Sequence, residues 1–162
     1  MHLLCRAIHF DFSPPQSMTL TRFSDYALRV LMFAAVRTGE PFSVGEVAAA
    51  YDLSKNHVAK VVNRLVRTGH LEARRGRGGG VRLKRDPVSI RLGSIVRLTE
   101  SEAPLVECFA VSTNRCRLTP ACRLQGVLAE ALHAFYDSLD KQTLADLVDN
   151  PAALASVLEA RE

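Results

Sequence analysis

The fold is decided by residues 43–69, which read SVGEVAAAYDLSKNHVAKVVNRLVRTG. The first serine is followed three residues later by a glutamate, the reciprocal capping arrangement that opens a helix, and this helix is predicted to end near Tyr51. After a short connection, Ser54 can cap the next helix, and Gly69 is placed to end it. The apolar residues of that helix recur at positions i, i+3, i+4 and i+7, namely Val58, Val61, Val62 and Leu65. Two short helices joined by a tight turn are typical of a helix-turn-helix.

The flanking segments complete a winged helix-turn-helix over residues 18–100. Upstream, a helix is predicted from Ser24 to near Gly39 on one apolar stripe, formed by Tyr26, Ala27, Val30, Leu31 and Ala34. Downstream, a hairpin is predicted, with strands over 71–75 and 81–84 and a glycine-rich turn over 76–80. A short helix is predicted to follow it over 92–98. The turn lacks the Gly-Lys-Ser/Thr ending of a nucleotide-binding loop, and no helix follows it immediately. We therefore interpret the hairpin as a wing.

The charges are segregated along the chain. Residues 54–97 contain twelve lysines or arginines against two acids, whereas residues 98–162 contain five against ten. So basic a block is typical of a surface that faces a polyanion, although charge alone is equally compatible with a solvated basic face. The helix-turn-helix context favours double-stranded DNA as the partner.

The predicted DNA-reading surface is the polar side of the helix that follows Ser54. The N-terminal part of a recognition helix reaches base edges in the major groove. We therefore expect Asn56 and His57 to contact bases, and Lys55 and Lys60 to contact phosphate. In the wing, three arginines are placed to contact phosphate or to enter a narrow minor groove, namely Arg74, Arg75 and Arg77.

Residues 1–17 show no helical or strand period, and we predict a disordered extension there, in which Cys5 has no function. No run of about 18 apolar residues and no secretion signal is recognisable, so we expect a cytoplasmic protein with no membrane partner. In a reducing compartment, cysteines are not expected to form structural disulfides.

Three cysteines lie within fifteen residues, at Cys108, Cys116 and Cys122. Their spacing differs from the close pairs of structural zinc sites, and three thiolates leave one iron of an iron–sulfur cluster without a ligand. The residues favour a cluster but leave open a zinc site, thiol redox sensing and loop cysteines without a function. We predict a cluster-binding loop over residues 101–123.

The C-terminal segment 122–162 is predicted to be helical. A long amphipathic helix over 122–139 is indicated by the apolar positions Leu124, Val127, Leu128, Ala131, Phe135 and Leu139. Thr143 with Asp146 resembles the capped start of a terminal helical segment. The fold class that we predict is therefore mainly α with a small β-hairpin, a winged helix-turn-helix head joined to a long helix.

Five segments together resemble the Rrf-type family of winged-helix transcriptional regulators, and within it the nitric-oxide-sensing repressors. They are residues 19–29 (TLTRFSDYALR), 54–58 (SKNHV), 78–83 (GGGVRL), 118–124 (LTPACRL) and 143–147 (TLADL). The resemblance runs from Met18 to about Val148. The family's regulators of cluster biogenesis carry a histidine three residues after the third cysteine, where this chain has Gln125, which argues against that branch.

The resemblance implies a homodimer that packs through the long helix, with one iron–sulfur cluster per subunit, of the two-iron or four-iron type, on Cys108, Cys116 and Cys122. In the nitric-oxide-sensing branch, an aspartate of the other subunit can complete a four-iron cluster. The matching residue is Asp25, which is explained equally well as a carboxylate favoured in the first helical turn by the helix dipole.

The function expected is that of a regulator and not an enzyme. We expect a repressor that binds an inverted-repeat promoter as a dimer while its cluster is intact, and that releases the DNA when nitric oxide nitrosylates the cluster. One alternative is a thiol- or iron–sulfur-status-sensing regulator of the same family. The other is a small iron–sulfur electron carrier, which leaves the basic block and the wing unexplained.

Overall fold

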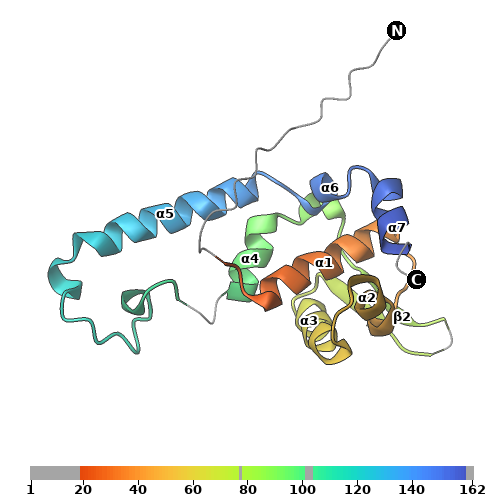
Figure 1. The fold of residues 1–162 in the computed structure, drawn as a ribbon, viewed down its shortest axis with the longest axis horizontal. Helices are drawn as coiled ribbons and strands as arrows, with labels where there is room; N and C mark the ends of the chain where they lie inside the picture. The colour runs from red at the N-terminus through yellow and green to blue at the C-terminus, as the bar shows by residue number, and fades with distance from the viewer. Residues whose placement is uncertain (1–18, 77, 101–103, 160–162) are drawn as a thin grey trace, which may run out of the picture.

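The computed structural model describes residues 19–76, 78–100 and 104–159, so the predicted extension and Arg77 lie outside the described residues. A helical head carries a small hairpin, and one long helix extends away from it (Figure 1). The α-helices are α1 (Arg22–Val36), α2 (Val44–Tyr51), α3 (Lys55–Arg67), α4 (Leu92–Glu100), α5 (Arg123–Asp140), α6 (Leu144–Leu147) and α7 (Pro151–Glu159). The strands are β1 (Leu71–Arg74) and β2 (Gly80–Leu83), and short 3-10 helices are η1 (Pro87–Ser89), η2 (Glu107–Phe109) and η3 (Thr119–Ala121). The predicted fold class is confirmed.

The core of the head lies where α1, α2 and α3 pack together. The apolar stripe predicted for α3 is buried, with exposed fractions of 4% or less at Val58, Val61, Val62 and Leu65. It faces α1, on which Ala27, Val30 and Leu31 have no exposed surface. Burial of each of these larger side chains contributes about 1.5–3 kcal/mol. This packing fixes the rotation of α3 and directs its polar side to the solvent.

The start of α3 is closed by backbone hydrogen bonds. Ser54 is the N-cap residue, but its side chain makes no capping hydrogen bond. Its backbone carbonyl instead accepts from the N–H groups of His57 and Val58, each at 3.0 Å. The predicted capping residue is therefore confirmed, but its backbone closes the first turn without its side chain. The predicted end is confirmed, since Gly69 follows the helix with a φ of +73°, a conformation that favours glycine.

The wing is an antiparallel pair in which Leu71 is opposite Leu83 and Arg74 is opposite Gly80. Phe42, in the connection before α2, exchanges two backbone hydrogen bonds of 2.8 Å with Val81 and so joins the wing to the head. A Cβ on Gly80 would lie 3.0 Å from the Phe42 oxygen, so this close approach requires glycine.

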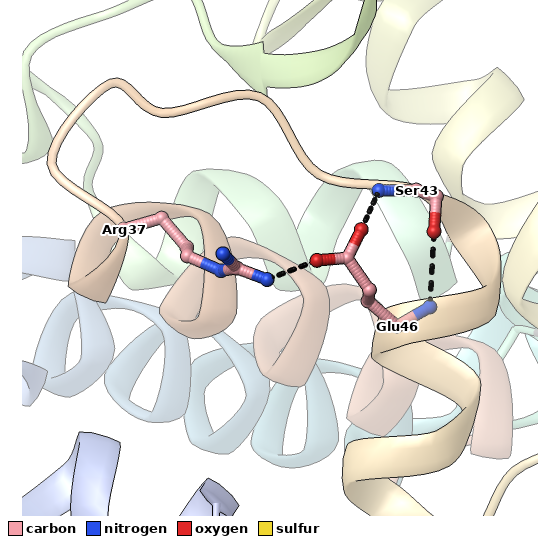
Figure 2. Close-up of polar contacts among 3 residues, drawn as sticks. All are labelled: Arg37, Ser43 and Glu46. Atoms are coloured by element: carbon pink, nitrogen blue, oxygen red, sulfur yellow. Dashed lines mark hydrogen bonds and ion pairs between the residues drawn. The ribbon is translucent and has the colours of Figure 1, made fainter.

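The predicted capping box at the start of α2 is present (Figure 2). The Ser43 N–H donates to Glu46 Oε2 at 2.7 Å, and the Glu46 N–H donates to Ser43 Oγ at 3.2 Å. The other carboxylate oxygen of Glu46 pairs with Arg37, which follows the last residue of α1. The Ser43 backbone hydrogen bond, supported by the Arg37 charge, lowers the pKa of Glu46. One carboxylate thus caps α2 and ties it to the end of α1.

The long helix α5 begins at Arg123, with Cys122 as its N-cap, and extends away from the head (Figure 1). Only its C-terminal part packs on the head, where Asp140 pairs with Arg97 of α4 at 2.6 Å. None of the described residues of α5 is buried. The predicted capped start of the terminal segment is confirmed, since Thr143 and Asp146 form a capping box at α6. Among the described residues, no helix is both long and apolar enough to cross a membrane.

Candidate nucleic-acid interface and metal centre

The polar side of α3 presents the predicted DNA-contacting residues together. Lys55, Asn56, His57 and Lys60 are all exposed, whereas Val58 between them is fully buried. The side chains therefore lie on the solvent face of the second helix of the helix-turn-helix, the element that enters the major groove in proteins of this architecture. The α2–α3 turn is tight because Asp52 adopts the left-handed conformation, with a φ of +52°.

The wing adds further positive charge beside this helix. Arg74 and Arg75 are exposed where β1 ends, and Arg77 lies outside the described residues. Arg82 on β2 pairs instead with Glu72 directly opposite it on β1. Arg74 and Arg75 therefore remain available for an external anion, while Arg82 is engaged within the wing.

The cysteine loop over residues 104–122 lies at the end of α5 that is remote from the head (Figure 1). Local hydrogen bonds tie it together. Gln125 Nε2 donates to the Cys108 carbonyl at 3.2 Å, which links the first cysteine to the turn of α5 that follows the third. The Cys116 carbonyl accepts from the Thr119 hydroxyl at 2.9 Å, and the Cys116 N–H donates to Asn114 Oδ1 at 2.9 Å. Hydrogen bonds thus hold Cys116 within its own turn and link Cys108 to the start of α5, which directly follows Cys122.

The three thiols are free and partly exposed, and their donor chemistry suits iron. Cys122 also lines a hollow of about 300 Å³ with Arg117, Leu118, Pro120 and Ala121. Exposed arginines adjoin two of the cysteines in sequence and would offset the negative charge of a thiolate-bound cluster; they are Arg115, Arg117 and Arg123. The loop thus fits an iron–sulfur cluster by its chemistry. In the described part of the chain, however, no three Cys, His, Asp or Glu side chains are close enough to hold a metal ion.

Asp25 lies in the first turn of α1, with its side chain 43% exposed. Its Oδ1 accepts from Arg29 Nε at 2.9 Å, one helical turn further along. The same end of α1 is held by the end of α4, where Glu100 Oε1 accepts from the Thr21 N–H at 2.8 Å. Ser24, which is fully buried, lies 2.6 Å from the Thr99 hydroxyl and also donates to Glu100.

This junction was not predicted from the sequence, because nearly 80 residues separate its two sides and no local pattern marks Glu100. Glu100 is the last described residue before the segment that leads into the cysteine loop, and Asp25 directly follows the buried Ser24. The junction therefore connects the approach to the cysteine loop with the start of α1.

The comparison with known proteins agrees with this architecture. The model of the Rrf2 family, described as an iron-dependent transcriptional regulator, matches residues 20–150. The HTH-type transcriptional regulator NsrR of Bacillus subtilis is 47% identical over 146 residues, which cover 90% of this chain and 100% of that protein. NsrR of Geobacillus kaustophilus is also 47% identical, over 89% of this chain and 99% of that protein.

A solved structure shows the same fold. IscR from T. potens superposes with a TM-score of 0.66 at 21% identity, over 83% of this chain and 88% of that chain. The family match covers most of the chain, and the NsrR relatives are similar along nearly their whole length. The resemblance predicted from the sequence is confirmed, and the chain belongs to the Rrf2 family of transcriptional regulators.

Proposed function

We propose that the protein is a dimeric, cytoplasmic repressor whose binding to an inverted-repeat promoter depends on an iron–sulfur cluster held by Cys108, Cys116 and Cys122, and that nitric oxide is its signal. The observation that carries this proposal is the arrangement of three free, partly exposed thiols in one loop, in a chain 47% identical to regulators named NsrR. When bound, the cluster supplies irons that react with nitric oxide.

The dimer is proposed to form through α5. This helix is 18 residues long and buries none of its described residues, and Leu124 and Val127 are 61% and 60% exposed. Exposed apolar side chains on one face of a helix are typical of a surface that another protein surface covers. A second α5 related by a two-fold axis would cover it symmetrically and would give two heads for the two half-sites of an inverted repeat.

The cysteine loop lies away from the head of its own chain, so a dimer built on α5 would bring it toward the head of the partner. The proposed fourth ligand is Asp25 of the partner subunit. Its carboxylate is partly exposed, and among the described residues its ion-pair partner is Arg29, which it can exchange for a metal ion. An oxygen ligand is harder than a thiolate, and its iron site is expected to be the most exchangeable.

This arrangement would couple the state of the cluster to DNA binding. Asp25 and the recognition helix belong to one head, in which α1 packs directly against α3. Loss of the cross-subunit ligand would release the restraint that it places on the relative position of the two heads. The proposed result is release of promoter DNA when the cluster is nitrosylated.

The test uses protein purified without oxygen, with wild type compared with Asp25→Ala. Stopped-flow absorbance follows the cluster after addition of nitric oxide, and fluorescence anisotropy follows a DNA duplex obtained by in vitro selection. We expect Asp25→Ala to remain dimeric and to keep the visible absorbance, but to differ from wild type in cluster stability and in its rate of reaction. Glu40→Ala, which removes an exposed carboxylate elsewhere on the head, is the control.

Identical stability, reaction rate and DNA release in wild type and Asp25→Ala would eliminate the cross-subunit ligand. DNA release by a thiol oxidant, with no response to nitric oxide, would favour the thiol-sensing alternative. An iron-loaded protein that binds no DNA specifically would favour the electron carrier.

A further inference from the structure

A second positively charged feature lies beside the recognition helix. A hollow of about 350 Å³ separates the start of α1 from α3 and is lined by Arg22, Phe23, Tyr26, His57, Lys60 and Val61. Two of these residues, His57 and Lys60, belong to the predicted DNA-contacting set of α3. The cation that α1 contributes, Arg22, was not among the predicted DNA contacts. None of the described residues that line the hollow carries a carboxylate.

The hollow has a fixed shape, because the elements around it are firmly held. Val61, which is 1% exposed, forms part of its floor, and the Tyr26 ring lies 6.4 Å from the His57 ring, centroid to centroid. Arg22 is the first residue of α1, directly after Thr21, whose backbone N–H is anchored to Glu100. The start of α1 is therefore tied both to the core and to α4.

The basic side chains converge on this site from two helices. His57 and Lys60 are three residues apart and so are neighbours on one face of α3. Arg22 and Lys60 are both exposed. Within the described residues, the nearest carboxylate in sequence to Arg22 is that of Asp25, and its charge is compensated by Arg29 at 2.9 Å. The hollow therefore presents net positive charge above an apolar floor, which favours an anion.

We propose that this hollow binds one backbone phosphate of the DNA duplex, with Arg22 and Lys60 as the cations that contact it. When a recognition helix enters the major groove, the phosphates that border the groove lie along the sides of that helix. Half or more of protein–DNA hydrogen bonds go to the phosphate and sugar, and such contacts fix the register of the protein on the duplex. Arg22 is thus a positioning contact made by α1, outside the helix-turn-helix and the wing.

This assignment deepens the proposed function, on which it rests for DNA as the ligand. It also gives α1 a part in both events, since Arg22 would contact DNA and Asp25, three residues later, would contact the cluster. A change in the relative position of the two heads would then displace this DNA contact directly.

The test measures DNA affinity against salt concentration for wild type, Arg22→Ala, Arg22→Lys and Lys141→Ala, with a duplex obtained by in vitro selection and a random duplex of equal length. Lys141 is an exposed cation at the end of α5 and serves as the charge-matched control. The logarithm of the DNA-binding constant falls linearly with the logarithm of the salt concentration, and each phosphate contact makes this slope steeper by about 0.9. With one hollow per subunit, and with Lys60 still at the phosphate, Arg22→Ala is expected to make the slope of the dimer less steep by up to about 1.8, which reduces the affinity lost between 50 and 200 mM salt by up to about 12-fold.

A second arm identifies the phosphate. Single phosphates of the selected duplex are replaced by neutral methylphosphonates, one symmetric pair at a time. We expect one symmetric pair of neutral linkages to weaken DNA binding by wild type and Arg22→Lys more than binding by Arg22→Ala, in which Lys60 is the remaining cation at that phosphate, whatever the base sequence. A slope for Arg22→Ala equal to that of Lys141→Ala, with no phosphate coupled to Arg22, would overturn the assignment. Failure of the wild type to prefer the selected duplex over the random one would overturn the proposed function as well.

Discussion

Replacing Gly93 by alanine tests the contact between α4 and α5, the helix that follows the cysteine loop. Gly93 lies in α4, where it faces the C-terminal part of α5. A Cβ at this position would lie 2.3 Å from Asp140 Oδ1 and 2.8 Å from the Tyr136 carbonyl oxygen. The Asp140 side chain can rotate away, but it would then leave Arg97, and the backbone of α5 at Tyr136 can yield only if the helix moves.

Two opposing effects determine how much Gly93→Ala lowers the free energy of unfolding. Overpacking costs about 1–3 kcal/mol, and simultaneous contact with a side chain and a backbone oxygen places this site near the upper end. Alanine is favoured over glycine in a helix interior by about 1 kcal/mol, which offsets part of that cost. The expected net loss of unfolding free energy is about 2 kcal/mol, and for a chain of this length it lowers Tm by about 4–8 °C.

The assay is thermal unfolding followed by circular dichroism, at one protein concentration because the Tm of a dimer depends on it. Gly45→Ala in α2 is the matched control, since a Cβ there would lie 3.6 Å from Ser43 Oγ, an ordinary contact. It is expected to melt at or slightly above the wild-type temperature. If Gly93→Ala melts as high as Gly45→Ala, the close approach of α4 and α5 is not as described.

Three further predictions concern pH, base recognition and assembly. Burial and the charge of Arg85 lower the pKa of His70 from its ordinary value of 6.5, so the unfolded chain binds more protons than the folded one below that pH. The free energy of unfolding is therefore expected to fall as the pH drops below 6.5, and to fall less steeply in His70→Gln. Thermal melts at several pH values measure this difference. Asn56→Ala is expected to relax base preference at one operator position by about 1–3 kcal/mol, measured by competition with singly substituted duplexes. DNA binding that weakens by the same factor at every sequence would indicate instead that Asn56 contacts phosphate. Val127→Glu is expected to convert the dimer to monomers in sedimentation analysis, whereas His133→Glu, at another exposed position of α5, is not; a fully dimeric Val127→Glu protein would remove this face from the interface.

The sequence predicted the elements whose signals are local. The stripe from Val58 to Leu65 determined which side of α3 is buried, and the capping residues at the starts of α2 and α6 marked those helix ends within a few residues. The wing was predicted from alternating residues around glycines. In each case, neighbours in sequence supply the energy that decides the structure.

The features that the sequence did not predict all depend on distant contacts. Glu100 reaches Thr21 across 79 positions, and Gly93 is needed only because α5 returns to α4 nearly 50 residues later. Arg22 gains its place beside Lys60 only when α1 packs on α3.

The most direct test of the central claim is the DNA affinity of protein purified without oxygen, measured together with its iron content and visible absorbance, for wild type, Cys116→Ala and Cys5→Ala. We expect wild type and Cys5→Ala to be coloured, to contain iron, to bind the selected duplex tightly and to lose that affinity after nitric oxide is added. Cys116→Ala is predicted to be colourless and to bind weakly at the start. A colourless, iron-free Cys116→Ala protein that binds the duplex with full wild-type affinity would contradict the claim that a cluster controls DNA binding.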